Sequence, residues 1–276
     1  MVQINASIVL YHNDKIQLLK AIESFLNTSL HVKLYLIDNS SDDNLKELKN
    51  IDERIEYIFN NANVGYGAGH NIAMQQSIKD CVSYHIVLNP DIYFQKGVLE
   101  GLYEYMQENK EVGHVMPKVV YPNGELQKLC KLLPTPLDLF ARRFIPLKSV
   151  IQKINYRYEL EFFNYEEIAE IPFLSGCFMF FRTDILKQNC LFDDDFFMYL
   201  EDADLTRRIA RLSKTIYYPK VTITHEYQRG AHKSKKLLWI FIKSVFIYFK
   251  KYGWAIDKER EIMNEKTLKV LGYYKK

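Results

Sequence analysis

The sequence predicts an α/β fold in which helices flank a mainly parallel central sheet. Two observations support this prediction. Short apolar segments typical of strands alternate with segments of helical periodicity through the first third of the chain. Polar side chains follow where these strands end, which is where ligands bind in parallel sheets: Tyr11, Asp38, Asn39 and Asp91.

The predicted elements of the first third succeed one another in a regular order. Runs of Ile, Leu and Val mark the strands, and apolar residues on one side of a turn mark the helices. Strands are expected at residues 6–11, 33–37, 55–59 and 84–88, and helices at residues 16–26, 45–49 and 69–79.

The later part of the chain is less regular. Strands are expected at residues 116–121, 173–181 and 215–224, and residues 134–171 form a long excursion of the kind that is often functional. We divide the chain into residues 1–115, residues 116–227 and a tail at residues 228–276.

Composition places the protein in a broad class. Its 276 residues are 48% hydrophobic and 26% charged, as in globular proteins that carry one large domain or two intimate ones. The four cysteines have no metal-ligand spacing, so a reducing cytoplasm is expected. The N-terminus lacks a basic segment followed by an apolar run, and it is expected to be a first strand instead of a signal peptide.

Charge is distributed unevenly along the chain. The tail, residues 228–276, has 13 Lys and Arg against 4 Asp and Glu, a net charge of +9. Its apolar run at residues 237–249 is too short to span a bilayer, and Lys243 interrupts it. We expect a buried amphipathic helix. Docking on a membrane surface and dimerisation are the alternative roles.

A dense acidic segment lies in the second half of the chain. Six of the twelve residues 193–204 are acidic, and a helical apolar pattern follows at Leu205, Ile209 and Leu212. Five apolar residues separate the two acidic clusters, which indicates carboxylates at the rim of a pocket. Such carboxylates serve metal binding or proton abstraction. The alternative is a helix N-terminus whose dipole favours acids.

Three shorter motifs follow strands. Asp38 opens a polar turn and could accept hydrogen bonds from a nucleobase or ribose, and the glycine-rich residues 60–71 could approach phosphates closely. Asn89-Pro90-Asp91 supplies a carboxylate for a divalent cation, with His225 as a candidate ligand. A purely structural role is the alternative in every case. The three motifs could be plain turns, and His225 could serve packing alone.

Taken in order, the motifs resemble the inverting family 2 glycosyltransferases, above all bacterial rhamnosyltransferase-like members and their galactofuranosyl relatives. The likeness runs from about residue 5 to residue 253. The segments that carry it are SIVLYHND, LIDNSSDD, NNANVGYGAGHN, VLNPDIYF, PNGELQK, SGCFMFFR, FDDDFFMYLEDADLTRR and THEYQRGAHKS.

The resemblance implies a GT-A fold, with a Rossmann-like nucleotide-sugar-binding half at residues 1–115, an acceptor-binding and catalytic half at residues 116–227, and a helical tail. It implies Mg²⁺ or Mn²⁺ held by Asp91 and His225. Asn89 stands where the family's Asp-x-Asp pattern has its first Asp, and it is therefore assigned to donor binding and not to the metal. The implied donor-binding residues are Tyr11, Asp38, Asn63, Gly65, Tyr66, His70, Asn71 and Asn89.

The resemblance also places the chemistry on the acidic segment. Glu201 and Asp202 match the family's Glu-Asp pair, with Asp202 as the catalytic base. Acceptor contacts are expected at Gly176, Cys177, Phe197 and Tyr199, for which a tight turn and core packing are the structural alternatives.

The predicted function is inverting transfer of a sugar, with rhamnose as one candidate, from a dTDP- or UDP-linked donor to a glycan or lipid-linked acceptor of a bacterial surface polysaccharide. The enzyme would be cytoplasmic, with its tail on the inner face of the plasma membrane or in a homodimer. The alternative is a non-catalytic sugar-nucleotide-binding or scaffold protein. Nucleic acid is not an expected partner, because the chain has no recognisable reader motif.

Overall fold

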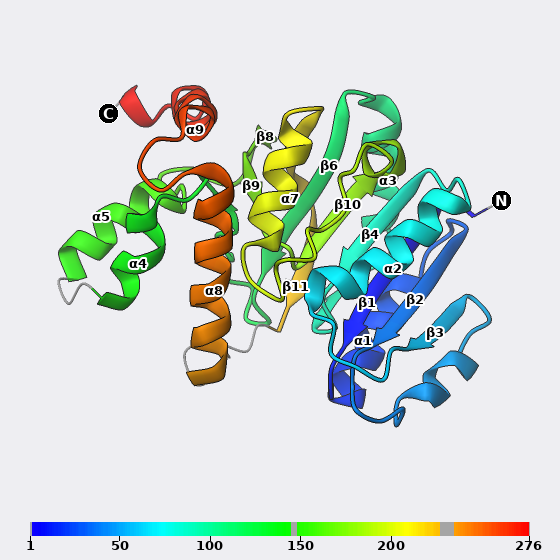
Figure 1. The fold of residues 1–276 in the computed structure, drawn as a ribbon. Helices are drawn as coiled ribbons and strands as arrows, with labels where there is room; N and C mark the ends of the chain where they lie inside the picture. Colours follow the sequence, from blue (N-terminus) through cyan, green and yellow to red (C-terminus); the bar gives the residue numbers. More distant parts are fainter. Residues whose placement is uncertain (1, 145–147, 227–234, 276) are drawn as a thin grey trace.

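A computed structural model describes residues 2–144, 148–226 and 235–275 (Figure 1). Nine strands form one sheet in the order β3-β2-β1-β4-β10-β6-β11-β5, with β8 paired to β11. The predicted α/β fold is confirmed. The bounds of the nine strands are Ile4–Leu10 (β1), Val32–Asp38 (β2), Ile55–Phe59 (β3), Tyr84–Leu88 (β4), Ile92–Phe94 (β5), Val112–Val120 (β6), Ala169–Glu170 (β8), Phe178–Arg182 (β10) and Lys214–His225 (β11).

The sheet is parallel in its first half and mixed beyond it. Strands β3, β2, β1 and β4 are parallel neighbours, whereas β10 runs antiparallel to β4 and β6. Strand β6 pairs with β11 in parallel, and the expected boundary at residue 115 falls inside β6. The two predicted halves therefore share one sheet. A second, small sheet pairs Cys130–Lys131 (β7) with Phe173–Leu174 (β9).

Helices cover both faces of the sheet. Side chains on a strand alternate between the two faces, so each face presents side chains that pack against helices. Even-numbered residues of β1, such as Ile8, pack with α1 and α3, whereas Ser7 faces α2. Helices α2 and α7 cross one face, and α8 stands beside the sheet at the side away from β3 (Figure 1). The helix bounds are Lys15–Leu26 (α1), Tyr66–Lys79 (α2), Val98–Glu108 (α3), Pro136–Phe144 (α4), Lys148–Tyr158 (α5), Thr183–Leu186 (α6), Glu201–Ala210 (α7), Lys235–Tyr252 (α8) and Lys258–Val270 (α9), with 3-10 turns at Lys46–Asn50 (η1) and Tyr273–Lys275 (η2).

Several expected elements differ in detail. The strand expected at residues 116–121 is β6, which begins at Val112. The helix expected at residues 45–49 is the 3-10 turn η1, and α2 begins at Tyr66, three residues earlier than expected. The strand expected at residues 173–181 is split into β9 and β10, because residues 175–177 form a loop between them. The excursion at residues 134–171 contains α4 and α5.

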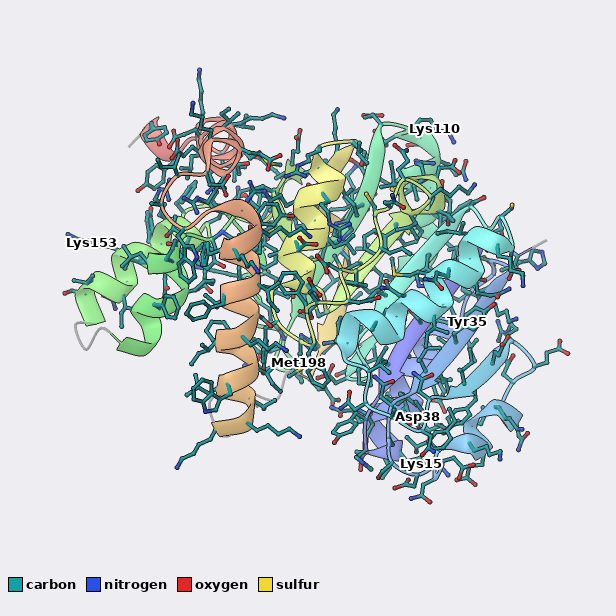
Figure 2. All side chains as sticks on the ribbon, in the orientation of Figure 1. Lys15, Tyr35, Asp38, Lys110, Lys153 and Met198 are labelled. Carbon is teal, nitrogen blue, oxygen red and sulfur yellow. The ribbon has the colours of Figure 1, made fainter. Side chains whose placement is uncertain are left out.

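The tail is packed into the body of the protein. Val245, Tyr248 and Phe249 of α8 are buried against Leu133, Phe173 and Phe196. The Ser244 hydroxyl donates to the carbonyl oxygen of Met198 at 2.7 Å, and Met198 lies next to α8 (Figure 2). Across the described ranges, no helix has both the length and the apolar character that crossing a bilayer needs.

Candidate active site

Two adjoining cavities lie at the carboxyl ends of β1 and β4. The carboxylate pocket, of about 750 Å³, includes Glu201 and Asp202 in its wall, and the asparagine pocket, of about 580 Å³, contains four asparagines. Both volumes suit small-molecule ligands. The two pockets share Tyr66, Asn89, Met198 and Tyr199. They therefore form one cleft with a common wall.

The backbone presents the two catalytic candidates by a sharp turn into α7. Tyr199 and Leu200 both have positive φ, 73° and 65°, which is uncommon for side chains of this size. Backbone N–H groups then hold the Asp202 carboxylate. Gly176 N–H donates to Oδ2 and Ala203 N–H donates to Oδ1, each at 2.9 Å. A Cβ at Gly176 would lie 3.0 Å from Cβ of Asp202, so the glycine permits this close approach.

The two neighbouring carboxylates have different surroundings. Burial raises the pKa of Glu201 well above its usual range, and the adjacent Asp202 raises it further. Its Oε2 is buried and has no hydrogen-bond partner among the described residues. Burial also raises the pKa of Asp202, but the hydrogen bond from Gly176 opposes that rise. Negative charge shared by the pair is therefore more stable on Asp202.

Asp91 and His225 meet in the same cleft, where His225 lines the carboxylate pocket and Asp91 lines the asparagine pocket. Nε2 of His225 lies 3.3 Å from Oδ1 of Asp91. Gln127 fixes the imidazole, because its Nε2 donates to the carbonyl oxygens of Val120 and His225, which turns its Oε1 toward Nδ1 of His225 at 3.0 Å. Nδ1 therefore faces the Gln127 oxygen as a donor, and Nε2 is the nitrogen that faces the carboxylate.

This donor set fits a divalent cation. An imidazole nitrogen and a carboxylate oxygen 3.3 Å apart are close enough to bind one cation together. An imidazole whose other nitrogen is held by an amide is a common arrangement at metal sites. The remaining ligands would come from outside this pair, since no group of three or more His, Cys, Asp or Glu side chains converges within the described residues.

Tyr66 forms the wall between the two pockets. Its hydroxyl lies 3.0 Å from Oδ1 of Asn89 and 2.8 Å from the carbonyl oxygen of Gly176. Its backbone N–H donates to the carbonyl oxygen of Phe197 at 2.9 Å. Burial raises the pKa of Tyr66 well above its usual range, so this hydroxyl stays a neutral donor. The tyrosine thus connects α2, β4 and the acidic segment.

Four predicted donor-binding residues in addition to Tyr66 are brought together in the asparagine pocket: Tyr11, Asn63, Gly65 and Asn89. Tyr11 is 51% exposed and available to a ligand. Gly65 has a φ of 98°, and a Cβ there would meet the carbonyl oxygen of Phe197 at 2.6 Å, so the turn that opens α2 needs glycine.

Three predicted donor residues are not among those that line the two pockets. Asp38 is fully buried, and its carboxylate accepts from Ser40 N–H at 2.8 Å and from the Tyr57 hydroxyl at 2.7 Å. Asn71 is nearly buried and exchanges hydrogen bonds with the backbone of Phe192, which anchors the acidic segment. Neither side chain lines the cleft, because each satisfies nearby backbone groups.

His70 is the third of these residues. It is buried beneath α2, where Nδ1 lies 2.7 Å from the Ser7 hydroxyl. That hydroxyl lies 2.9 Å from His85, which in turn contacts Ser77 at 2.7 Å. Burial lowers the pKa of His70 well below its usual range, so it is neutral. The histidine belongs to a polar network between α2 and β1 and does not reach the cleft.

The predicted acceptor residues lie along the cleft. Gly176 and Cys177 line the carboxylate pocket, Phe197 lines the asparagine pocket, and Tyr199 lines both. Sequence reasoning assigned no role to several other lining residues. They come from the PNGELQK segment, the small sheet, the end of α5 and the tail: Gln127, Lys128, Lys131, Glu159, Lys236, Leu237 and Ile240.

Comparisons with known proteins identify the family of the chain. The model of Glycosyl transferase family 2 matches residues 7–190, and the chain belongs to this family. An N-acetylglucosaminyl-diphospho-decaprenol L-rhamnosyltransferase of Mycobacterium tuberculosis is 25% identical over 219 residues, 72% of this chain and 68% of that protein. The low-salt glycan biosynthesis hexosyltransferase Agl10 of Haloferax volcanii is 27% identical over 155 residues, 48% of this chain and 50% of Agl10.

Solved structures share the fold. GalNAc-T7 with UDP, GalNAc and Mn²⁺ superimposes with a TM-score of 0.64 at 15% identity, covering 99% of this chain and 57% of that chain. Residues 1–349 of S. aureus TarS with UDP superimpose with a TM-score of 0.60 at 13% identity. The match covers 99% of this chain and 72% of the TarS chain. The chain spans 37% of a longer TarS structure that it also matches. The predicted GT-A fold and family 2 membership are confirmed.

Proposed function

We propose that the protein transfers a sugar, with inversion, from a dTDP- or UDP-linked donor to a glycan or lipid-linked acceptor. The observation that carries this proposal is Asp202, oriented by Gly176 and Ala203 at the wall of a cleft that continues to Asp91. A carboxylate and a candidate cation site in one continuous cleft suit an acceptor hydroxyl and a diphosphate bound next to each other.

The chemistry follows from a single displacement. The acceptor hydroxyl oxygen bonds to the anomeric carbon from the face opposite the diphosphate, and the bond from that carbon to the diphosphate oxygen breaks with its electron pair. The hydroxyl proton passes to Asp202, whose oxygens each keep a second lone pair beside the hydrogen bond already accepted. Positioned proton acceptance of this kind contributes roughly 10²–10⁴-fold.

Glu201 supports this assignment by staying protonated. Two adjacent buried carboxylates do not both ionise readily, and the raised pKa of Glu201 leaves the charge on Asp202. Asp91 and His225 would hold Mg²⁺ or Mn²⁺, which neutralises charge on a departing diphosphate when bound. Tyr66 keeps the wall between acceptor and donor sides in place through Asn89.

Relatives guide the choice of substrates. The names of the two sequence relatives include a rhamnosyltransferase and a hexosyltransferase, and one names a diphospho-decaprenol-linked sugar. Two structural neighbours contain UDP, and one of them also contains Mn²⁺. We infer a nucleotide diphosphate sugar, with rhamnose or another hexose, and an acceptor of surface polysaccharide synthesis. The four cysteines are free, which fits the proposed cytoplasmic location.

A nucleotide-sugar panel tests the proposal. Purified protein is incubated with dTDP- and UDP-sugars, with Mn²⁺ or Mg²⁺, and release of the nucleotide diphosphate and thermal stabilisation are recorded. At least one donor should both stabilise the protein and release nucleotide. Stabilisation without release, even with a panel of glycan and lipid-linked acceptors, would identify a sugar-nucleotide-binding protein and overturn the transferase proposal.

A further inference from the structure

Helix α8 has an exposed stripe that its packing role does not explain. The helix has five lysines and no acidic residue in its eighteen residues. Positions 239, 243, 246 and 250 follow the spacing of one helical face, and all four are exposed. We call this set, Trp239, Lys243, Phe246 and Lys250, the aromatic–lysine stripe.

The opposite face of α8 fixes the orientation of the stripe. Val245 and Phe249 are fully buried, and Ser244 is bound to the backbone of Met198. Lys251 is also committed to the body, since its amine lies 2.6 Å from Asp193 and 2.7 Å from Asp204. The stripe therefore faces outward as a consequence of the packing on the other side.

Large aromatic side chains are unusually open along the stripe. Trp239 is 71% exposed and Phe246 is 56% exposed. Trp254, which is 40% exposed, extends the surface beyond the helix, with its ring 5.1 Å from that of Phe246. Tryptophan is favoured at the boundary between headgroups and acyl chains, because its ring is apolar and its N–H is polar.

The charge of this surface distinguishes between two possible binding partners, a second copy of the chain and an anionic lipid surface. Lys235 and Lys236 stand exposed one turn before Trp239 and add to the two lysines of the stripe. A symmetric homodimer through this face would set the same lysines against one another, because a two-fold interface pairs a patch with itself. An anionic lipid surface is complementary to the lysines and accepts the aromatic rings between its headgroups.

We propose that the aromatic–lysine stripe docks on an anionic lipid bilayer, with α8 lying along its surface. The same helix reaches the cleft, because Lys236, Leu237 and Ile240 line the asparagine pocket. Docking brings one wall of the cleft to the membrane surface, where a lipid-linked acceptor would be found. The docking itself does not depend on the proposed transfer.

Intrinsic fluorescence offers a direct test, because Trp239 and Trp254 are the two tryptophans of the chain. The full chain is mixed with vesicles of phosphatidylcholine alone or of phosphatidylcholine with phosphatidylglycerol, without a sugar donor. With the anionic vesicles, we expect co-sedimentation that weakens at high salt, a blue-shifted emission and quenching by brominated lipid. Failure of this binding would leave the transferase proposal intact, since nucleotide release is measured separately.

Matched variants separate the stripe from net charge. Lys243→Glu and Phe246→Ala should weaken binding, with roughly a fivefold loss for each lysine charge removed. Lys269→Glu and Ile262→Ala make the same changes at exposed positions of α9 and should bind as the wild type does. Equal binding to neutral and anionic vesicles, equal loss with Lys269→Glu, or a vesicle-independent dimer that buries the tryptophans would each overturn the proposal.

Discussion

Arg207 and Asp257 form a bidentate ion pair that joins helix α7 to the tail. Nη1 of Arg207 lies 2.7 Å from Oδ2 of Asp257, and Nη2 lies 2.6 Å from Oδ1, with side chains that are 2% and 3% exposed. The guanidinium also stands 3.9 Å over the ring of Tyr252. Helix α7, whose first turn contains Glu201 and Asp202, is thus held by residues fifty positions away.

Removing one partner of this pair should destabilise the protein strongly. Asp257→Ala leaves the buried guanidinium of Arg207 without its bidentate carboxylate. We therefore expect the free energy of unfolding to fall by roughly 3–5 kcal/mol. Arg211→Ala breaks the more exposed pair with Glu259 and should cost less than about 1 kcal/mol. Denaturant unfolding measures both, and equal losses would contradict the role of the buried pair.

The assignment of Asp202 as base predicts a selective loss. Asp202→Asn keeps the size of the side chain but cannot accept the proton, so turnover should fall by roughly 10²–10⁴-fold. Thermal stabilisation by the donor should persist. Asp195→Asn, an exposed change in the same acidic segment, should retain turnover. Near-normal turnover of Asp202→Asn would place the base elsewhere.

Glu201 predicts a pH dependence of stability. Its folded pKa is raised, mainly by burial, above the ordinary value of 4.5. The folded state therefore retains a proton that the unfolded state releases, and stability should decline as pH rises from about 4.5 toward the folded pKa. Glu201→Gln removes this decline and should be more stable than the wild type at neutral pH. Unfolding curves at several pH values test this, and parallel declines in both proteins would refute it.

The Asp91–His225 pair predicts metal linkage. Bound Mn²⁺ should raise the unfolding midpoint, by an amount equivalent to roughly 2.7 kcal/mol at a hundredfold excess over the dissociation constant. Asp91→Asn and His225→Ala should abolish this rise, and Gln127→Leu should lower metal affinity roughly 10–100-fold. Asp43→Asn, at an exposed position, is the control. An unchanged response in His225→Ala would exclude the histidine as a ligand.

Much of this architecture is legible in the sequence. Strand and helix periods identified β1 to β4, and polar residues at strand ends located the cleft, because parallel strands bring their carboxyl ends to one edge. The sequence did not show that His70 packs against β1, because only one side of the first turn of α2 faces the cleft and the other side faces the sheet. A Cβ at Gly69 would lie 2.8 Å from Val9, which shows how close that approach is.

Other lining residues depend on long-range pairing. Lys131 reaches the carboxylate pocket because β7 pairs with β9, more than forty residues later in the chain, and Lys236 reaches the asparagine pocket through the packing of α8. The local periodicity of apolar residues carries no information about such distant contacts. The same applies to Asp38, whose burial depends on Tyr57 from the neighbouring strand.

The ion pair between Arg207 and Asp257 also constrains when the enzyme becomes complete during synthesis. Ribosomes add roughly 5–20 residues per second, so α7 emerges on the order of seconds before Asp257 and Glu259 follow it. During that interval the nascent chain can form the parallel strands β1 to β4, while α7 lacks its acidic partners. Helix α7 is thus fixed in place only after the segment that contains Asp257 and Glu259 has been synthesised.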